Sequence, residues 1–137
     1  MKTILEILKK TGGWKPSLYL RIENPPFMPL VIEALDESGP CGLPALSVAH
    51  YGEQNGDLMR DPEMCFELVL AAGAHLAPFY FRNDYLGTEQ FSRTIMDDQY
   101  VFDRELYDQH HEFTKVWDKN LSQQGFIAAF ERRRTQR

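Results

Sequence analysis

The sequence has few of the features that cross-link a chain or anchor it in a membrane. Only two of its 137 residues are cysteines, Cys41 and Cys65, and they do not form a CxxC pair. This usage suits a reducing cytosol better than a disulfide scaffold. No apolar run approaches the roughly 18 residues that span a bilayer, and Glu6 interrupts the apolar stretch at the N-terminus, unlike a signal peptide. We therefore expect a cytoplasmic protein without a membrane segment.

The motifs that identify common enzyme classes are also missing. The sequence contains no glycine-rich phosphate loop, no GxSxG elbow, no HExxH pair and no CxxC zinc pair. These absences argue against most hydrolases and NTPases, so no cofactor is expected.

The length and composition are those of one globular domain covering residues 1–137, with 43% hydrophobic and 26% charged residues. The net charge of −5 is unevenly distributed, because residues 131–137 carry +3 and the remainder carries −8. An acidic body repels nucleic acid phosphates. We expect nucleic-acid contact only through Arg132, Arg133 and Arg134, and such a basic tail is more often a solvated helix end.

Hydrophobic periodicity predicts the order of the elements. A helix is expected over residues 1–12, with a capping box formed by Thr3 and Glu6 and an end at Gly12-Gly13. Mainly antiparallel strands are expected over residues 17–95, among them strands at 30–35, 45–51, 79–82 and 89–95. Asn55-Gly56 is a strong hairpin signal. Pro62 should interrupt or bulge the returning strand, because proline cannot donate to the ladder.

The period returns to 3.6 near Asp98, which predicts a long helix over residues 98–124 followed by a short turn and a basic tail at 131–137. The apolar stripe of this helix consists of Phe102, Leu106, His110, Phe113, Trp117 and Leu121. His110 is expected to be a core or boundary histidine. The fold class is therefore α+β, with an antiparallel sheet of about five to six strands and the N-terminal and long C-terminal helices packed on one face.

The segment HYGEQNGDLMRDPEM, residues 50–64, concentrates ionisable side chains beside the predicted turn. A two-residue turn at Asn55-Gly56 would place Tyr51 opposite Arg60 and His50 opposite Asp61, with Cβ atoms about 4.5–5.5 Å apart. His50 and Asp61 are candidates for a catalytic dyad in general-base chemistry. The alternative, which we favour, is a structural pair that fixes the hairpin register.

The same segment offers hard ligands for a metal ion, with His50, Asp57 and Asp61 as candidates. Their spacing matches no calcium loop, and carboxylates gather at hairpin ends for reasons of turn chemistry, so no metal is expected. Polar and aromatic side chains around this turn and a later one are candidates for binding. They are Tyr51, Gln54, Asn55, Asp57, Arg60, Asn83 and Asp84.

Three segments together resemble a family of uncharacterised bacterial proteins found on plasmids, phages and integrated mobile elements. They are the central tract YGEQNGDLMRDPEM, the later segment FRNDYLGTEQF and the closing WDKNLSQQGF. The resemblance spans roughly residues 45–126 and is most specific in the central tract. It implies a small cytosolic accessory protein and supplies no catalytic residue, cofactor or partner.

Two functions from different classes follow. The first is an accessory or regulatory protein that acts through protein–protein contacts, as a monomer or as a homodimer paired through an exposed sheet edge. The alternative is a metal-dependent hydrolase or nuclease that uses the cluster of His50, Asp57 and Asp61.

Overall fold

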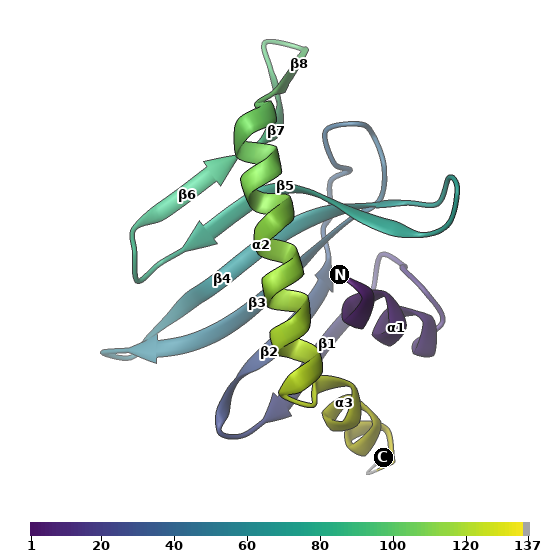
Figure 1. Ribbon diagram of the computed structural model, residues 1–137, viewed down its shortest axis with the longest axis vertical. Coiled ribbons are helices and arrows are strands. Elements are labelled where there is room, and N and C mark those ends of the chain that lie inside the picture. Colours follow the sequence, from purple (N-terminus) through teal and green to yellow (C-terminus); the bar gives the residue numbers. More distant parts are fainter. Residues whose placement is uncertain (136–137) are drawn as a thin grey trace.

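Three helices cover one face of a six-stranded antiparallel sheet in the computed structural model, which describes residues 1–135 (Figure 1). The predicted α+β class and the predicted placement of the helices are confirmed. The helices are α1 (Lys2–Lys10), α2 (Arg104–Gln123) and α3 (Phe126–Thr135). The strands of the main sheet are β1 (Tyr19–Asn24), β2 (Phe27–Ala34), β3 (Ala45–Gln54), β4 (Asp57–Val69), β5 (His75–Asn83) and β6 (Thr88–Phe91).

The main sheet is a meander in which each strand pairs with the next strand along the chain. A second sheet contains only β7 (Arg93–Met96) and β8 (Gln99–Phe102). In β1 the side chains alternate, because Leu20 and Ile22 are buried while Tyr19 and Arg21 are exposed. The apolar side of this strand therefore faces the helices while its polar side faces outward. The first six residues of β3, in the middle of the sheet, are buried on both faces.

The start of α1 differs from the predicted capping box. The helix begins at Lys2, Met1 is its N-cap, and no side chain within the helix caps it. The backbone N–H of Thr3 instead donates to Asp118 Oδ1 of α2 at 2.9 Å. A carboxylate from a distant helix thus satisfies one of the free amides of the first turn, and it ties α1 to α2.

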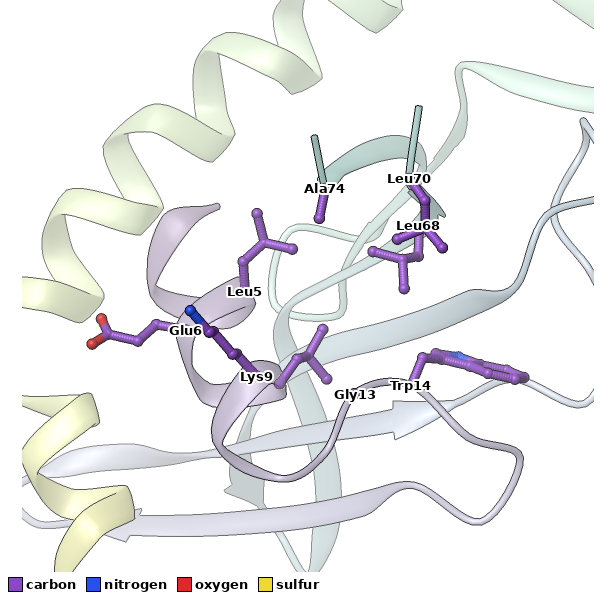
Figure 2. Close-up of a pocket in the computed structure, with 9 residues that line it drawn as sticks. Leu5, Glu6, Lys9, Gly13, Trp14, Leu68, Leu70 and Ala74 are labelled. Atoms are coloured by element: carbon purple, nitrogen blue, oxygen red, sulfur yellow. The ribbon is translucent and has the colours of Figure 1, made fainter. Parts of the chain in front are cut away.

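An apolar pocket of about 550 Å³ lies between α1 and the end of β4 (Figure 2). Leu5 and Leu8 of α1 line one side, and Leu68 and Leu70 line the other. Trp14 closes the pocket, and its indole N–H donates to the carbonyl of Ala45 at 2.9 Å. The helix is therefore held to the sheet by a polar contact as well as by apolar packing.

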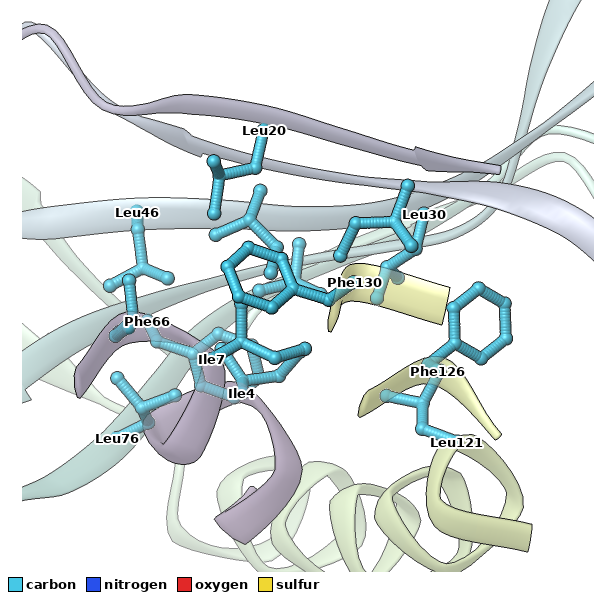
Figure 3. Close-up of a cluster of buried hydrophobic side chains, with 14 of the residues drawn as sticks. Ile4, Ile7, Leu20, Leu30, Leu46, Phe66, Leu76, Leu121, Phe126 and Phe130 are labelled. Atoms are coloured by element: carbon cyan, nitrogen blue, oxygen red, sulfur yellow. The ribbon is translucent and has the colours of Figure 1, made fainter. Parts of the chain in front are cut away.

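The core lies between the helices and the inner face of the sheet (Figure 3). All three helices and the first five strands contribute fully or nearly fully buried side chains. Among them are Ile4, Ile7, Leu20, Ile22, Leu30, Ile32, Leu46, Val48, Met64, Phe66, Leu76, Trp117, Leu121, Phe126 and Phe130. Burial of this apolar surface is the main force that holds α1 and α3 on the sheet, since short helices are marginal alone.

The segment between residues 89 and 103 is where the sequence predictions were wrong. The single strand expected at 89–95 is divided into β6 and β7, and residues 99–102 form β8 instead of the start of a helix. Asp97 and Asp98 both have positive φ and make a two-residue turn that pairs Met96 with Gln99. The helix α2 begins only at Arg104, where the N-cap Asp103 accepts from the N–H of Leu106 at 3.0 Å.

The predicted short turn and basic tail form a longer helix than expected. α3 extends from Phe126 to Thr135, because Phe126, Ala129 and Phe130 supply a buried face at helical spacing. Gln136 and Arg137 of the predicted tail lie outside the described residues. Of the helices that are described, none combines the length and the apolar character that crossing a membrane requires.

Candidate functional site

The β3–β4 hairpin has the predicted turn and most of the predicted register. Gln54 pairs with Asp57 and Tyr51 pairs with Arg60, with Asn55 and Gly56 at positive φ in the turn. The register then shifts by one residue between Tyr51 and Ala49, which pairs with Glu63. The predicted bulge at Pro62 is therefore confirmed.

The same bulge overturns the predicted direct pairing of His50 with Asp61. The shift leaves His50 opposite both Asp61 and Pro62, because Pro62 cannot donate to the ladder. The imidazole Nδ1–H of His50 donates to the carbonyl of Met28 at 3.2 Å, while Asp61 Oδ1 accepts from Asn83 Nδ2 at 2.8 Å. The imidazole and the carboxylate thus have separate partners.

His50 lies in an aromatic part of the core. Its ring centroid is 5.6 Å from that of Trp117 and 5.5 Å from that of Phe126. Burial lowers the pKa of His50, and this effect outweighs the opposing contributions of the Met28 carbonyl and of Asp61. A neutral imidazole that fills space between α2 and the sheet is the structural role that this geometry supports.

The three candidate metal ligands are not brought together. Asp57 is exposed at the tip of the hairpin, at the start of β4. His50 is buried further down the hairpin in β3, away from the tip. Within residues 1–135, no group of three or more His, Cys, Asp and Glu side chains is placed to hold a metal ion. Gln54 and Asn55, two of the binding candidates, are likewise exposed at the hairpin tip.

Four other binding candidates do come together. The guanidinium of Arg60 lies over the ring of Tyr51 at 5.8 Å. The backbone N–H of Arg60 donates to Asp84 Oδ2 at 2.8 Å. Arg82 Nε donates to Asp84 Oδ1 at 2.6 Å. Burial alone would raise the pKa of Asp84, but the hydrogen bonds from Arg60 and Arg82 outweigh this effect and lower the pKa. With the contact between Asn83 and Asp61, this network joins β4 to the β5–β6 turn.

A buried ion pair, which the sequence predictions missed, joins Glu67 of β4 to Arg93 at the start of β7. Arg93 Nη1 donates to Glu67 Oε1 at 2.6 Å, and the two side chains are only 7% and 1% exposed. Arg93 also donates to the carbonyls of Pro78 and Ala77 at 3.1 and 3.0 Å. The ion pair and these hydrogen bonds fix the base of the second sheet to β4 and β5.

The other oxygen of Glu67 holds the loop between β2 and β3. Glu67 Oε2 accepts from the N–H groups of Cys41 and Leu43 at 2.9 and 3.1 Å. The loop passes so close that a Cβ on Gly39 would overlap Glu67 Cγ. The sequence contained one signal for this site, since Glu67 is the only charged residue in the apolar run from Met64 to Leu70.

The second sheet is a hairpin, here called the β7–β8 arm (residues 93–102), which projects beyond the six-stranded sheet (Figure 1). Its apolar side chains are exposed, with Ile95 at 49% and Met96 at 59%. Tyr100, Val101 and Phe102 of β8 are also exposed. Ile95 lies opposite Tyr100 in the ladder, on the same face as Phe102, whereas Met96 and Val101 lie on the other face. Exposed apolar surface of this kind marks interaction sites on soluble proteins.

Acidic residues surround the arm. Asp97 and Asp98 form its turn, and Asp103, Glu105 and Asp108 follow at the start of α2. A single basic residue lies among them, since Arg104 Nε is 3.8 Å from Asp108 Oδ2. The arm is therefore an apolar surface with a negative rim.

The remaining candidates have structural contacts. His110 is buried as predicted, and its Nε2–H donates to Gln90 Oε1 at 2.8 Å. The predicted nucleic-acid contacts Arg132, Arg133 and Arg134 lie on α3, where Arg132 Nη2 is 3.5 Å from Asn24 Oδ1. Arg134 lies over the ring of Phe130 at 5.7 Å and pairs with Glu131.

The fold and this site define an α+β protein that presents an anchored apolar hairpin, without an assembled metal cluster in residues 1–135. The chain belongs to the family described as a domain of unknown function, DUF6908, whose family model matches residues 2–127. The expected membership in an uncharacterised domain family is confirmed. Neither a curated protein nor a solved structure matches the chain.

Proposed function

We propose that this protein is an accessory or regulatory protein that acts by binding another protein through the β7–β8 arm. The observation that carries the proposal is the combination of an exposed apolar surface with a rigid base. Five large apolar side chains are exposed on a two-stranded hairpin whose first residue, Arg93, is held in a buried ion pair. The arm is thus held at its base by Arg93 and by the contact of Phe102 with Tyr107, while its five apolar side chains stay at least two-fifths exposed.

Holding the base of the arm in place lowers the entropy cost of binding a partner. An isolated two-stranded hairpin is marginally stable in water, and ordering it on binding would reduce the affinity. Because Glu67 and the carbonyls of β5 hold Arg93, the base of the arm is ordered before a partner arrives. Tyr100 and Phe102 are residue types enriched at the centre of protein interfaces.

The charge around the arm supports one kind of partner. Five carboxylates and one arginine leave a negative rim around the apolar centre. Complementarity then favours a protein with an apolar groove rimmed by lysine or arginine, and electrostatic attraction would speed its encounter with the arm. The family resemblance supports a cytoplasmic protein of bacterial plasmids, phages or other mobile elements as the setting.

Site-specific photo-crosslinking tests this proposal. A photoreactive phenylalanine analogue at Tyr100 should capture a protein in cells of the source organism, whereas the same group at the exposed Leu58 of β4 should not. The captured protein is then purified and titrated against the wild type, Ile95→Lys and Leu58→Lys. We expect Ile95→Lys to weaken binding at least 100-fold, because Ile95 lies opposite Tyr100 on the same face of the arm, and Leu58→Lys to leave binding unchanged. Equal crosslinking at both positions, or equal affinity of both variants, would overturn the proposal.

A further inference from the structure

A second surface with the opposite charge lies far along the chain from the arm. Helix α1 and strand β1 both contact α3 (Figure 1). Side chains at the end of α1, around the start of β1 and on α3 form a cleft of about 280 Å³. Four basic residues line it, Lys10, Lys15, Arg133 and Arg134, together with the hydroxyl groups of Thr11, Ser17 and Tyr19. Residues from both ends of the chain meet here, which the predicted basic tail alone did not show.

The cleft has an excess of positive charge. Glu131 pairs with two of its cations, with Oε1 2.8 Å from Lys10 Nζ and 3.9 Å from Arg134 Nη1. Lys15 is exposed and has no ion-pair partner within residues 1–135. Lys10, Lys15 and Arg134 against the carboxylate of Glu131 therefore leave a local positive field that attracts anions, in a chain whose net charge is −5.

An exposed aromatic ring extends the cleft. Tyr19 is 56% exposed, and it lines both this cleft and an adjoining hollow of about 250 Å³ on the uncovered face of the sheet. Arg21, Tyr51 and Arg60 also line that hollow. Glu33 lies opposite Tyr19 in the ladder and confines the strongest positive charge to the first cleft. A basic groove that leads to a ring is the combination found in proteins that bind single strands.

We propose that this cleft binds backbone phosphates of a single-stranded nucleic acid, with a base stacked on Tyr19. The cations and the Ser17 hydroxyl supply donors to phosphate oxygens, and the tyrosine ring supplies a stacking surface that tolerates any base. An anionic membrane is a poorer fit, because Phe126, Ala129 and Phe130 bury the apolar face of α3 in the core. This site is independent of the arm, so each proposal can fail without the other.

Fluorescence anisotropy with labelled dT20 and rU20 oligonucleotides tests the site on the full chain. We expect binding that weakens about 20- to 50-fold between 50 and 200 mM salt, as three to four phosphate contacts to a single strand imply. Lys15→Glu should weaken binding at least ten-fold at 50 mM salt and reduce the salt slope by about one. Tyr19→Ala should weaken binding, and Tyr19→Phe should retain it because the ring is kept.

Lys119→Glu on the exposed side of α2 is the matched control, because it makes the same charge change away from the cleft. Circular dichroism and thermal melting would show that each variant is folded, and the exposure of Lys15 makes its loss structurally mild. Absence of binding at 50 mM salt would overturn the proposal. So would equal losses in Lys15→Glu and Lys119→Glu, binding to a duplex as tight as to the single strand, or binding to anionic vesicles alone.

Discussion

The two hairpins of this protein have the same kind of turn and opposite surroundings. β3–β4 turns at Asn55-Gly56 and β7–β8 turns at Asp97-Asp98, and both central residues of each turn have positive φ. Beyond its tip, β3–β4 lies in the middle of the six-stranded sheet, with β2 and β5 on either side. The β7–β8 arm has no third strand, and its apolar side chains remain exposed.

This difference shows that the contacts that stabilise the arm lie at its base rather than along its exposed apolar side chains. The β3–β4 hairpin is stabilised along its length by neighbouring strands and by core packing of Val48, Met64 and Phe66. The arm is held at its base, by the ion pair of Arg93 with Glu67, by the hydrogen bonds of Arg93 to two carbonyls of β5, and by the contact of the Phe102 ring with Tyr107. A segment held at one end can keep apolar side chains free for a partner, whereas a segment held by its apolar side chains cannot.

The largest effect is expected when the ion pair between Glu67 and Arg93 is removed. In Glu67→Gln the buried Arg93 loses its counter-ion, so we expect the free energy of unfolding to fall by about 3–5 kcal/mol. Urea denaturation measures this loss. Hydrogen exchange should accelerate most in residues 93–102 and in the loop that Glu67 holds at Cys41 and Leu43, and least in the tip of β3–β4, which Glu67 does not contact.

The control replaces both charges by apolar residues of similar volume. Glu67→Leu with Arg93→Met should recover much of the stability lost in Glu67→Gln, because no unpaired charge then remains buried. If Glu67→Gln accelerated exchange equally in both hairpins, the arm would not depend specifically on this anchor.

Substitutions in the two turns should change the free energy of unfolding by smaller amounts and in opposite directions. Gly56→Ala puts a Cβ on a residue with a φ of +85°, and we expect a cost of about 1–2 kcal/mol. Asp98→Gly removes a side chain from a residue with a φ of +62°, and we expect a gain of about 0.5 kcal/mol after the entropy cost of glycine. Thermal unfolding of both variants checks the opposite signs, and two changes of the same sign would contradict the assignment.

The sequence predicted one hairpin and missed the other for a physical reason. Asn55-Gly56 is the residue pair that this turn prefers, whereas Asp97-Asp98 adopts the same backbone with residues that also begin helices. The apolar residues of β8 then continued the helical stripe of α2, so Phe102 was placed in a helix that starts at Arg104. Periodicity identifies which residues share a face, but the presence or absence of a covering element is a tertiary property.

The same limit applies to the candidate site. The pairing of Tyr51 with Arg60 follows from local turn geometry and was predictable. The pairing of Glu67 with Arg93 joins residues that no local pattern relates, and it depends on how β7 passes over β5. The predicted opposition of His50 and Asp61 failed because the bulge at Pro62 shifts the register, and Asp61 accepts from Asn83 instead.

Acidification should affect the core beside the first hairpin. Burial lowers the pKa of His50 and of His110 from the ordinary value of 6.5, so the unfolded chain takes up these protons first. The free energy of unfolding should therefore be independent of these groups above pH 7 and should fall as the pH drops below about 6.5. Urea midpoints measured from pH 8 to pH 5 test this sign.

Two histidine variants separate this effect from general acid sensitivity. His50→Leu removes one of the buried imidazoles and should reduce the loss of stability between pH 7 and pH 5. His75→Asn removes an exposed histidine and should leave the pH profile unchanged. A profile that is equally steep in the wild type and in His50→Leu would show that the imidazole is not responsible.

The smallest effect on stability is expected from substitutions of exposed apolar side chains on the two hairpins. Ile95 of the arm and Leu58 near the tip of β3–β4 are 49% and 67% exposed, so Ile95→Lys and Leu58→Lys should each change the free energy of unfolding by less than about 0.5 kcal/mol. Only Ile95→Lys should weaken binding of the partner captured at Tyr100, because it places a charge directly opposite that ring on the same face of the arm. A loss of stability well above this value in Ile95→Lys alone would mean that the arm packs within its own chain, and that its apolar residues serve the fold.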